Sequence, residues 1–171
     1  MDEISGTLRM WKPSDAPVVL AAAREPLMAR QFATSVDTLD DAEAWVAARR
    51  DDHAAGRAFA FAVLDEAGSA VGNVAVSNVE RRHQTGWVSY WLLERGRGQG
   101  LAAGACRVLA RWAFEEQQLF RLELGHRVDN PASCRVAVSA GFAVEGLERA
   151  KLQYGGTRFD VERHARLATD A

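Results

Sequence analysis

The stretch Tyr90-Trp91-Leu92-Leu93-Glu94-Arg95-Gly96-Arg97-Gly98-Gln99-Gly100-Leu101-Ala102 decides the fold, because it joins an apolar strand to a helix through a glycine-rich turn. The three glycines let the main chain adopt conformations that a Cβ would forbid and let it approach a ligand closely. N–H groups of such a turn converge at the start of the next helix, where unpaired donors and a partial positive charge favour an anion. The turn therefore predicts a phosphate-binding loop, with Arg95 and Arg97 as further anion contacts.

Two other kinds of phosphate loop do not match this turn. A P-loop needs Lys-Ser or Lys-Thr after its last glycine, whereas Leu101-Ala102 follows here. A dinucleotide fingerprint needs a third glycine three positions after the second, and position 101 is Leu. A second frame, from Gly98, matches only if Ala103 replaces the last glycine. The pattern that fits is Arg-x-x-Gly-x-Gly, at residues 95–100.

The remaining hydrophobic pattern predicts a mixture of helices and strands. The helices are expected at 14–24, 39–53 with Thr38 or Asp40 as cap, 99–116, and 131–140 after Asn130. The strands are expected at 7–11, 59–64, 70–76, 87–93, 120–124, 145–152 and 158–167.

The Arg-x-x-Gly-x-Gly turn resembles the pyrophosphate loop of the GNAT superfamily of acyl-CoA N-acyltransferases. Downstream, Asn130-Pro131-Ala132-Ser133, Gly141-Phe142 and Glu145-Gly146 are similar to a run in the RimJ/RimL-like branch, the ribosomal-protein N-terminal acetyltransferases. The resemblance implies an α+β GNAT fold, a mixed but mostly antiparallel twisted sheet of about seven strands with helices on both faces. It also implies a V-shaped opening between the fourth and fifth strands, in which the pantetheine arm of acetyl-CoA lies like an added strand.

The same resemblance assigns the cofactor-binding residues. Main chain at Leu92 and Leu93 would hold the pantetheine arm and the acyl carbonyl, and Asn130 would bond an amide of the arm. The diphosphate would lie on the loop, Arg95, Gly96, Arg97, Gly98, Gln99, Gly100, Leu101 and Ala102.

Direct attack of an amine on a thioester needs a base for the ammonium, an oxyanion donor and a group that stabilises the leaving thiolate. Ser133 is the candidate beside the sulfur. Many GNAT enzymes use a tyrosine seven residues after the asparagine, but that position is Ala137 here. Glu123 is the candidate base, with Tyr90, His83, His126 and Glu148 as weaker ones, and Glu123 is equally interpretable as an ion-pair partner.

Composition indicates one domain, residues 1–171, because the chain is too short for two ordinary domains. A net charge of -2 and the lack of a basic tail give no attraction to nucleic acid. No apolar run is long enough for a membrane span and no signal peptide is visible, so a cytoplasmic location is the expectation. Cys106 and Cys134 show no zinc-type spacing, and no metal is expected.

We therefore expect an N-acetyltransferase that moves an acetyl group from acetyl-CoA to a primary amine, either a protein N-terminal α-amine or a small molecule. Alternatives are a longer donor such as succinyl-CoA, a noncatalytic acyl-CoA-binding regulatory module, and a dinucleotide oxidoreductase, which the fingerprint mismatch disfavours. A homodimer is also an option.

Overall fold

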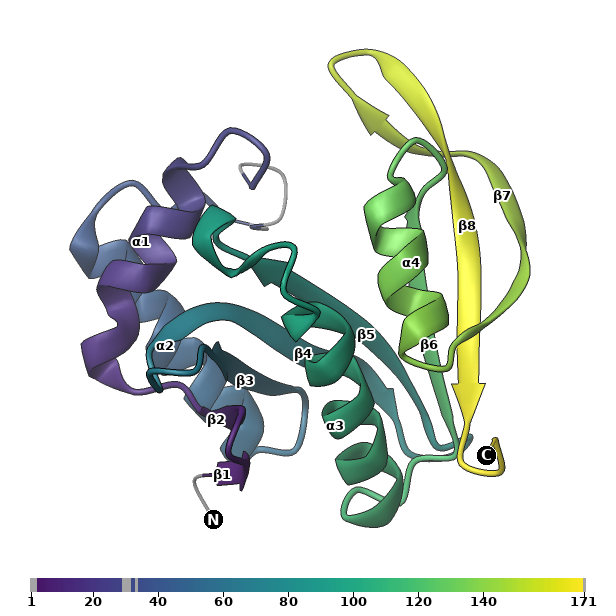
Figure 1. Ribbon diagram of the computed structural model, residues 1–171, viewed down its shortest axis with the longest axis horizontal. Coiled ribbons are helices and arrows are strands. Elements are labelled where there is room, and N and C mark those ends of the chain that lie inside the picture. Colours follow the sequence, from purple (N-terminus) through teal and green to yellow (C-terminus); the bar gives the residue numbers. More distant parts are fainter. Residues whose placement is uncertain (1–2, 29–31, 33, 171) are drawn as a thin grey trace.

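A computed structural model describes residues 3–28, 32 and 34–170 of the chain, and they form one sheet with helices on both faces (Figure 1). The strands are β1 (Glu3–Ser5), β2 (Leu8–Met10), β3 (Phe59–Leu64), β4 (Ala70–Glu80), β5 (Thr85–Leu92), β6 (Arg121–Arg127), β7 (Ala143–Tyr154) and β8 (Thr157–Leu167). The helices are α1 (Ala16–Arg24), α2 (Leu39–Ala54), α3 (Leu101–Glu115) and α4 (Pro131–Ser139), with short 3-10 turns η1 (Pro13–Asp15) and η2 (Glu94–Gly96).

The sheet has the order β1-β2-β3-β4-β5-β6-β8-β7. Only β5 and β6 run parallel; every other neighbouring pair of described strands is antiparallel. The expected mixed, mostly antiparallel α+β sheet is confirmed. The strand that raises the count above the expected seven is β1, a three-residue strand that the sequence pattern did not predict.

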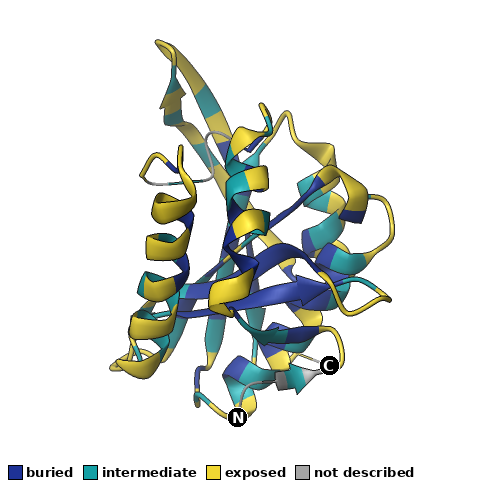
Figure 2. Cartoon of the chain, turned by 90° about the vertical axis from the view of Figure 1, so that its left-hand side faces the viewer, coloured by how far each residue is buried: buried dark blue, intermediate teal, exposed yellow. Residues whose placement is uncertain are grey.

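Two cores fill the two faces because inward and outward positions alternate along the strands. Phe59, Phe61 and Val63 of β3 pack with α3 and α4, whereas Ala60, Ala62 and Leu64 pack with α1 and α2. Figure 1 shows α3 and α4 in front of the sheet and α2 behind it. In Figure 2 the buried residues gather in the central strands, and exposed residues cover the β7–β8 hairpin.

Local sequence accounts for where the helices begin. Thr38 caps α2: its hydroxyl accepts from the N–H of Asp41 at 3.1 Å, and the Asp41 carboxylate accepts from the N–H of Thr38 at 2.9 Å. This confirms Thr38 over Asp40 as the cap. Among the described residues, no helix is both long and apolar enough to cross a bilayer.

Candidate active site

An opening in the sheet forms where β5 and β6 part. They pair through three residues only, Thr85 with Arg121, Gly86 with Leu122 and Trp87 with Glu123. Beyond these pairs β5 continues to Leu92 and β6 to Arg127, and no register pair joins the two strands there in the described part of the chain. Figure 1 shows the strands separating with α4 beside the gap. Counted from the strand at residues 7–11, these are the fourth and fifth strands, so the expected opening is confirmed.

The glycine loop lies at the end of β5 and leads into α3. Gly98 and Gly100 have φ of 76° and 75°, a region that a side chain disfavours, and Gly100 is the N-cap of α3. The N–H groups of Gly96 and Arg97 bond to Leu93 O and Glu94 O. No described acceptor takes the N–H groups of residues 98–100, and the first turn of α3 adds further unpaired donors. The loop therefore presents a run of main-chain donors suited to an anion.

Both arginines of the loop bond to the protein itself. Arg95 donates to Ala70 O at 2.8 Å, and Arg97 donates to Leu92 O at 3.0 Å and to the Glu25 carboxylate at 2.5 Å. Glu25 also accepts from the N–H of Glu94. These contacts fasten the loop to β4 and to the residue that follows α1. Sequence reasoning missed Glu25, which lies 72 residues from Arg97 and belongs to no motif.

The main chain expected to hold the pantetheine arm is partly engaged. Leu92 and Leu93 are buried, and the Leu92 carbonyl accepts from Arg97. The Leu93 N–H donates to Val71 O at 2.8 Å, and its carbonyl accepts from Gly96. A pantetheine contact at these residues stays a prediction, and the engaged Leu93 groups favour Leu92 and the free edge of β5 before it.

On the other side of the opening, α4 begins at Pro131 with Asn130 as its N-cap. The Asn130 side-chain oxygen accepts from the N–H of Ser133 at 3.2 Å. Tyr90 reaches across from β5, and its hydroxyl donates to Ser133 O at 3.4 Å. Burial raises the pKa of Tyr90 to about 12, so the phenol is neutral at physiological pH. The structure thus brings Asn130, Ser133 and Tyr90 together beside the gap.

Glu123 lies where the two strands part, but both of its carboxylate oxygens are occupied. One accepts from Arg121 at 2.8 Å and the other from Arg163 at 2.6 Å. Arg163 also contacts Glu148 at 3.3 Å and lies over the ring of Trp87 at 4.7 Å. Both oxygens of Glu123 are engaged by guanidinium groups of the protein itself. The ion-pair interpretation of Glu123 is therefore present in the structure, and its role as a base stays a prediction.

The weaker base candidates are spread over the molecule. Glu148 is paired with Lys151 at 2.6 Å as well as with Arg163. His83 is exposed in the β4–β5 turn. His126 is buried under α4, where its Nε2 lies 3.0 Å from Nε2 of His164.

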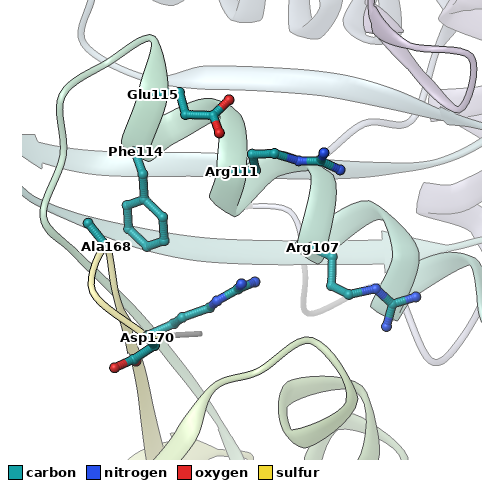
Figure 3. A pocket seen from close by; sticks show the side chains of 7 residues that line it. Arg107, Arg111, Phe114, Glu115, Ala168 and Asp170 are labelled. Carbon is teal, nitrogen blue, oxygen red and sulfur yellow. The ribbon is translucent and has the colours of Figure 1, made fainter.

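A separate hollow of about 340 Å³ lies between the second half of α3 and the segment after β8 (Figure 3). Arg107, Arg111 and Arg166 contribute to its lining, together with Phe114, Glu115, Ala168 and Asp170. Arg107 and Arg166 donate to the carbonyls of Ser139 and Ala140, at the C-terminal end of α4. The hollow is therefore distinct from the opening, which adjoins the N-terminal end of α4.

The glycine loop, the parted parallel strands and the capped α4 are the parts that the GNAT resemblance requires, and comparison with known proteins agrees. Residues 7–143 match the family model described as an acetyltransferase (GNAT) domain. Because this match spans most of the chain, the chain belongs to the GNAT acetyltransferase family.

Individual relatives place the chain near the ribosomal-protein acetyltransferases. It is 30% identical over 115 residues to the ribosomal-protein-serine acetyltransferase of Escherichia coli, covering 67% of this chain and 64% of that protein. The chain spans about half to two thirds of the length of the curated relatives that it matches.

Two solved structures share the fold. RimL, an α-N-protein acetyltransferase of a ribosomal protein in complex with coenzyme A, superposes with a TM-score of 0.85 at 23% identity over 97% of each chain. A mutant of the spermidine N-acetyltransferase SpeG from Vibrio cholerae superposes with a TM-score of 0.78 at 19% identity over 94% of each chain.

Proposed function

We propose that the chain transfers an acetyl group from acetyl-CoA to a primary amine by direct attack in a ternary complex. The parting of β5 and β6 after three residue pairs is the observation that carries the proposal. Edge groups of two separated strands need partners, and an amide-bearing arm can supply them as an added strand would. The family membership supports acetyl-CoA as the arm's source.

The diphosphate of acetyl-CoA would lie on the N–H groups of residues 98–102. The left-handed conformations of Gly98 and Gly100 leave this main chain uncovered by side chains. In our proposal Arg95 and Arg97 hold the loop in place through Ala70, Leu92 and Glu25 and add positive potential. Their direct contact with the diphosphate is the part of the proposal that a structure of the complex must test.

The leaving thiolate would lie at the start of α4. Ser133 is the third residue of this helix, where the partial positive charge of the helix terminus favours an anion. A serine hydroxyl is a weak acid, so we propose that Ser133 hydrogen-bonds the thiolate rather than giving up its proton completely. The neutral Tyr90 phenol contacts this helix at Ser133 O and adds a second hydroxyl to this wall, which has no tyrosine at position 137.

The acceptor we propose is the α-amine of a protein N-terminus. The support is that the relative from Escherichia coli is a ribosomal-protein-serine acetyltransferase and that RimL is an α-N-protein acetyltransferase of a ribosomal protein. A small amine is the competitor, since a protein of the same fold is a spermidine N-acetyltransferase. Because proteins of this fold use both kinds of acceptor, the acceptor is identified by the following experiment.

The test measures free thiol released from acetyl-CoA with a panel of acceptors. A peptide with a free N-terminus and an internal lysine is paired with the same peptide blocked at its N-terminus, beside spermidine and single amino acids. We expect thiol release with the free peptide, none with the blocked one, and an added acetyl group on the α-amine by mass spectrometry. Succinyl-CoA in a parallel arm tests the longer donor.

Each other outcome has a defined meaning. Turnover of the blocked peptide or of spermidine alone would replace the α-amine with a side-chain or small-molecule amine. Tight acetyl-CoA binding without turnover of any amine would favour the regulatory module, to which the alanine at 137 lends support. Failure to bind acetyl-CoA would refute the proposal. Light scattering of the same sample tells a homodimer from a monomer.

A further inference from the structure

Four side chains that can bind a metal meet beneath α4. They come from three elements: His126 from β6, Cys134 from α4, and Glu162 and His164 from β8. Each offers one ligand atom, and the four atoms lie within 4.8 Å of one another. The two histidines are buried, while the Cys134 and Glu162 side chains reach partly exposed positions. The cluster is therefore shielded on the histidine side and open to entry on the other.

Four of the six distances between the ligand atoms are close to those of a tetrahedral site, and the other two, from Cys134 Sγ to the two Nε2 atoms, are within 4.8 Å. The two histidine Nε2 atoms are 3.0 Å apart, and Glu162 Oε1 lies 3.0 Å from Nε2 of His164 and 3.3 Å from Nε2 of His126. Cys134 Sγ lies 3.4 Å from the same Glu162 oxygen. Tetrahedral zinc with bonds of about 2.0 to 2.3 Å has edges of roughly 3.3 to 3.7 Å. Outward movements of a few tenths of an ångström would complete these four edges.

The other ring nitrogens are arranged as in metal-binding histidines. Nδ1 of His126 faces Arg127 O at 2.9 Å, and Nδ1 of His164 faces Phe142 O at 3.4 Å. A carbonyl only accepts, so both contacts are satisfied by the tautomer that bears the proton on Nδ1. In that tautomer the two Nε2 lone pairs and the Glu162 carboxylate converge, and a cation at their centre would join them. In the other tautomer, the Nε2–H of His164 donates to Glu162 at 3.0 Å.

We propose that His126, Cys134, Glu162 and His164 form a zinc-binding site. Two imidazoles, a thiolate and a carboxylate are ligands that zinc accepts, and four protein ligands characterise a structural site. On binding, the Cys134 thiol loses its proton to solvent and the sulfur bonds to the metal. The metal would tie α4 to β6 and β8, so it would fix the helix whose first residues include Asn130 and Ser133. It takes no part in acetyl transfer.

The test uses cobalt as a spectroscopic probe for the same site. Protein without a histidine tag is freed of metal with a chelator and titrated with Co²⁺, and then with Zn²⁺. We expect one Co²⁺ per chain, the visible bands of tetrahedral cobalt, a thiolate-to-cobalt charge-transfer band, and displacement by Zn²⁺. Zinc at a hundredfold excess over its Kd should raise the melting temperature by about 5 to 10 °C.

Matched variants separate this site from adventitious binding. Cys134→Ser should lose the charge-transfer band and most of the thermal shift, whereas Cys106→Ala, which changes the other cysteine, should keep both. His126→Gln should abolish binding at one equivalent, whereas His83→Gln, which changes an exposed histidine, should not. Circular dichroism checks that each variant is folded.

The result that would overturn the proposal is equally clear. Absence of stoichiometric Co²⁺ and Zn²⁺ binding by the wild-type protein would refute the site, and an unchanged cobalt spectrum in Cys134→Ser would show that Cys134 is not a ligand and would refute the site as proposed.

Discussion

The substitution Gly98→Ala tests whether the glycine loop binds the diphosphate, because its effect on stability and its effect on acetyl-CoA affinity can be measured separately. Gly98 has a φ of +76°, and a Cβ placed there would meet no heavy atom within 4 Å. The free energy of unfolding therefore falls only by the cost of a left-handed residue with a side chain, about 1 to 2 kcal/mol. In a domain of this size this corresponds to a fall in melting temperature of about 2 to 8 °C.

The effect on acetyl-CoA is expected to be larger than strain alone explains. The added methyl group projects into the open space over the loop, where the diphosphate would approach the main chain. Losing one main-chain hydrogen bond to a charged group costs about 1.5 to 3 kcal/mol, which raises the Kd roughly 10- to 150-fold. Calorimetry with acetyl-CoA measures this Kd, and a thermal melt measures the stability.

Gly56→Ala is the matched control. Gly56 has a φ of +66°, and a Cβ there would meet Arg81 at 3.9 Å, an ordinary contact. It precedes β3, whose first residue, Phe59, pairs with Val76, so it lies at the opposite end of the sheet from the loop that follows Leu92. The melting temperature of this variant should fall by about as much as that of Gly98→Ala, whereas its Kd for acetyl-CoA should equal that of the wild type. Equal Kd values in the wild type and in Gly98→Ala would refute the assignment of the loop.

Three further predictions address the base, the core and the opening. Glu123→Gln should lower kcat less than tenfold, because both carboxylate oxygens are engaged by Arg121 and Arg163. A fall in kcat of more than a hundredfold, with a flattened pH–rate profile, would instead indicate that Glu123 is the base. Burial raises the pKa of the Cys106 thiol from 9.0 to about 12, so the unfolded chain loses this proton at a lower pH than the folded protein. The contribution of this thiol to the free energy of unfolding is therefore intact below pH 9 and falls as the pH rises toward 12. Between pH 9 and 10 the wild type should therefore lose about 1 kcal/mol more unfolding free energy than Cys106→Ala, measured by urea denaturation, and parallel curves would contradict this. Hydrogen exchange should slow on acetyl-CoA addition at residues 88–92 and 124–127, the lengths of β5 and β6 that do not pair with each other. Unchanged exchange there would argue against an arm lying between the two strands.

Much of the fold was predictable because it depends on local signals. The alternation of Phe and Ala in β3, the Thr38 cap and the Asn130-Pro131 start of α4 each act within a few residues. The left-handed residues of the loop follow from its glycines in the same way. The order of the strands in the sheet was not predictable in this way. β6 pairs with β8 rather than with β7, and no residue near β6 in the sequence specifies that pairing.

The candidate site was predictable only where a motif carries it. Asn130 and Ser133 were found from the resemblance of the Asn-x-x-Ser run to the RimJ/RimL-like branch, and the structure places them together. The link from Arg97 to Glu25 and the cluster of His126, Cys134 and His164 join residues far apart in sequence. The cluster also depends on the register of β6 with β8. A single cysteine with two separated histidines matches no metal-binding spacing, so the cluster could not be recognised as a motif.

The arrangement of α4 explains how a site can persist beside so short a strand pairing. Within the described residues, three residue pairs of β5 and β6 join the sheet across the opening, so main-chain pairing alone fixes the two halves weakly. α4 supplies other connections: Tyr90 reaches Ser133 O near its start, and Arg107 of α3 reaches Ser139 O at its end. Arg166 of β8 holds the next carbonyl, that of Ala140. Because side chains rather than strand pairs fix this wall, the edges of β5 and β6 stay unpaired and available to a ligand, while the groups proposed to meet the thiolate keep their positions.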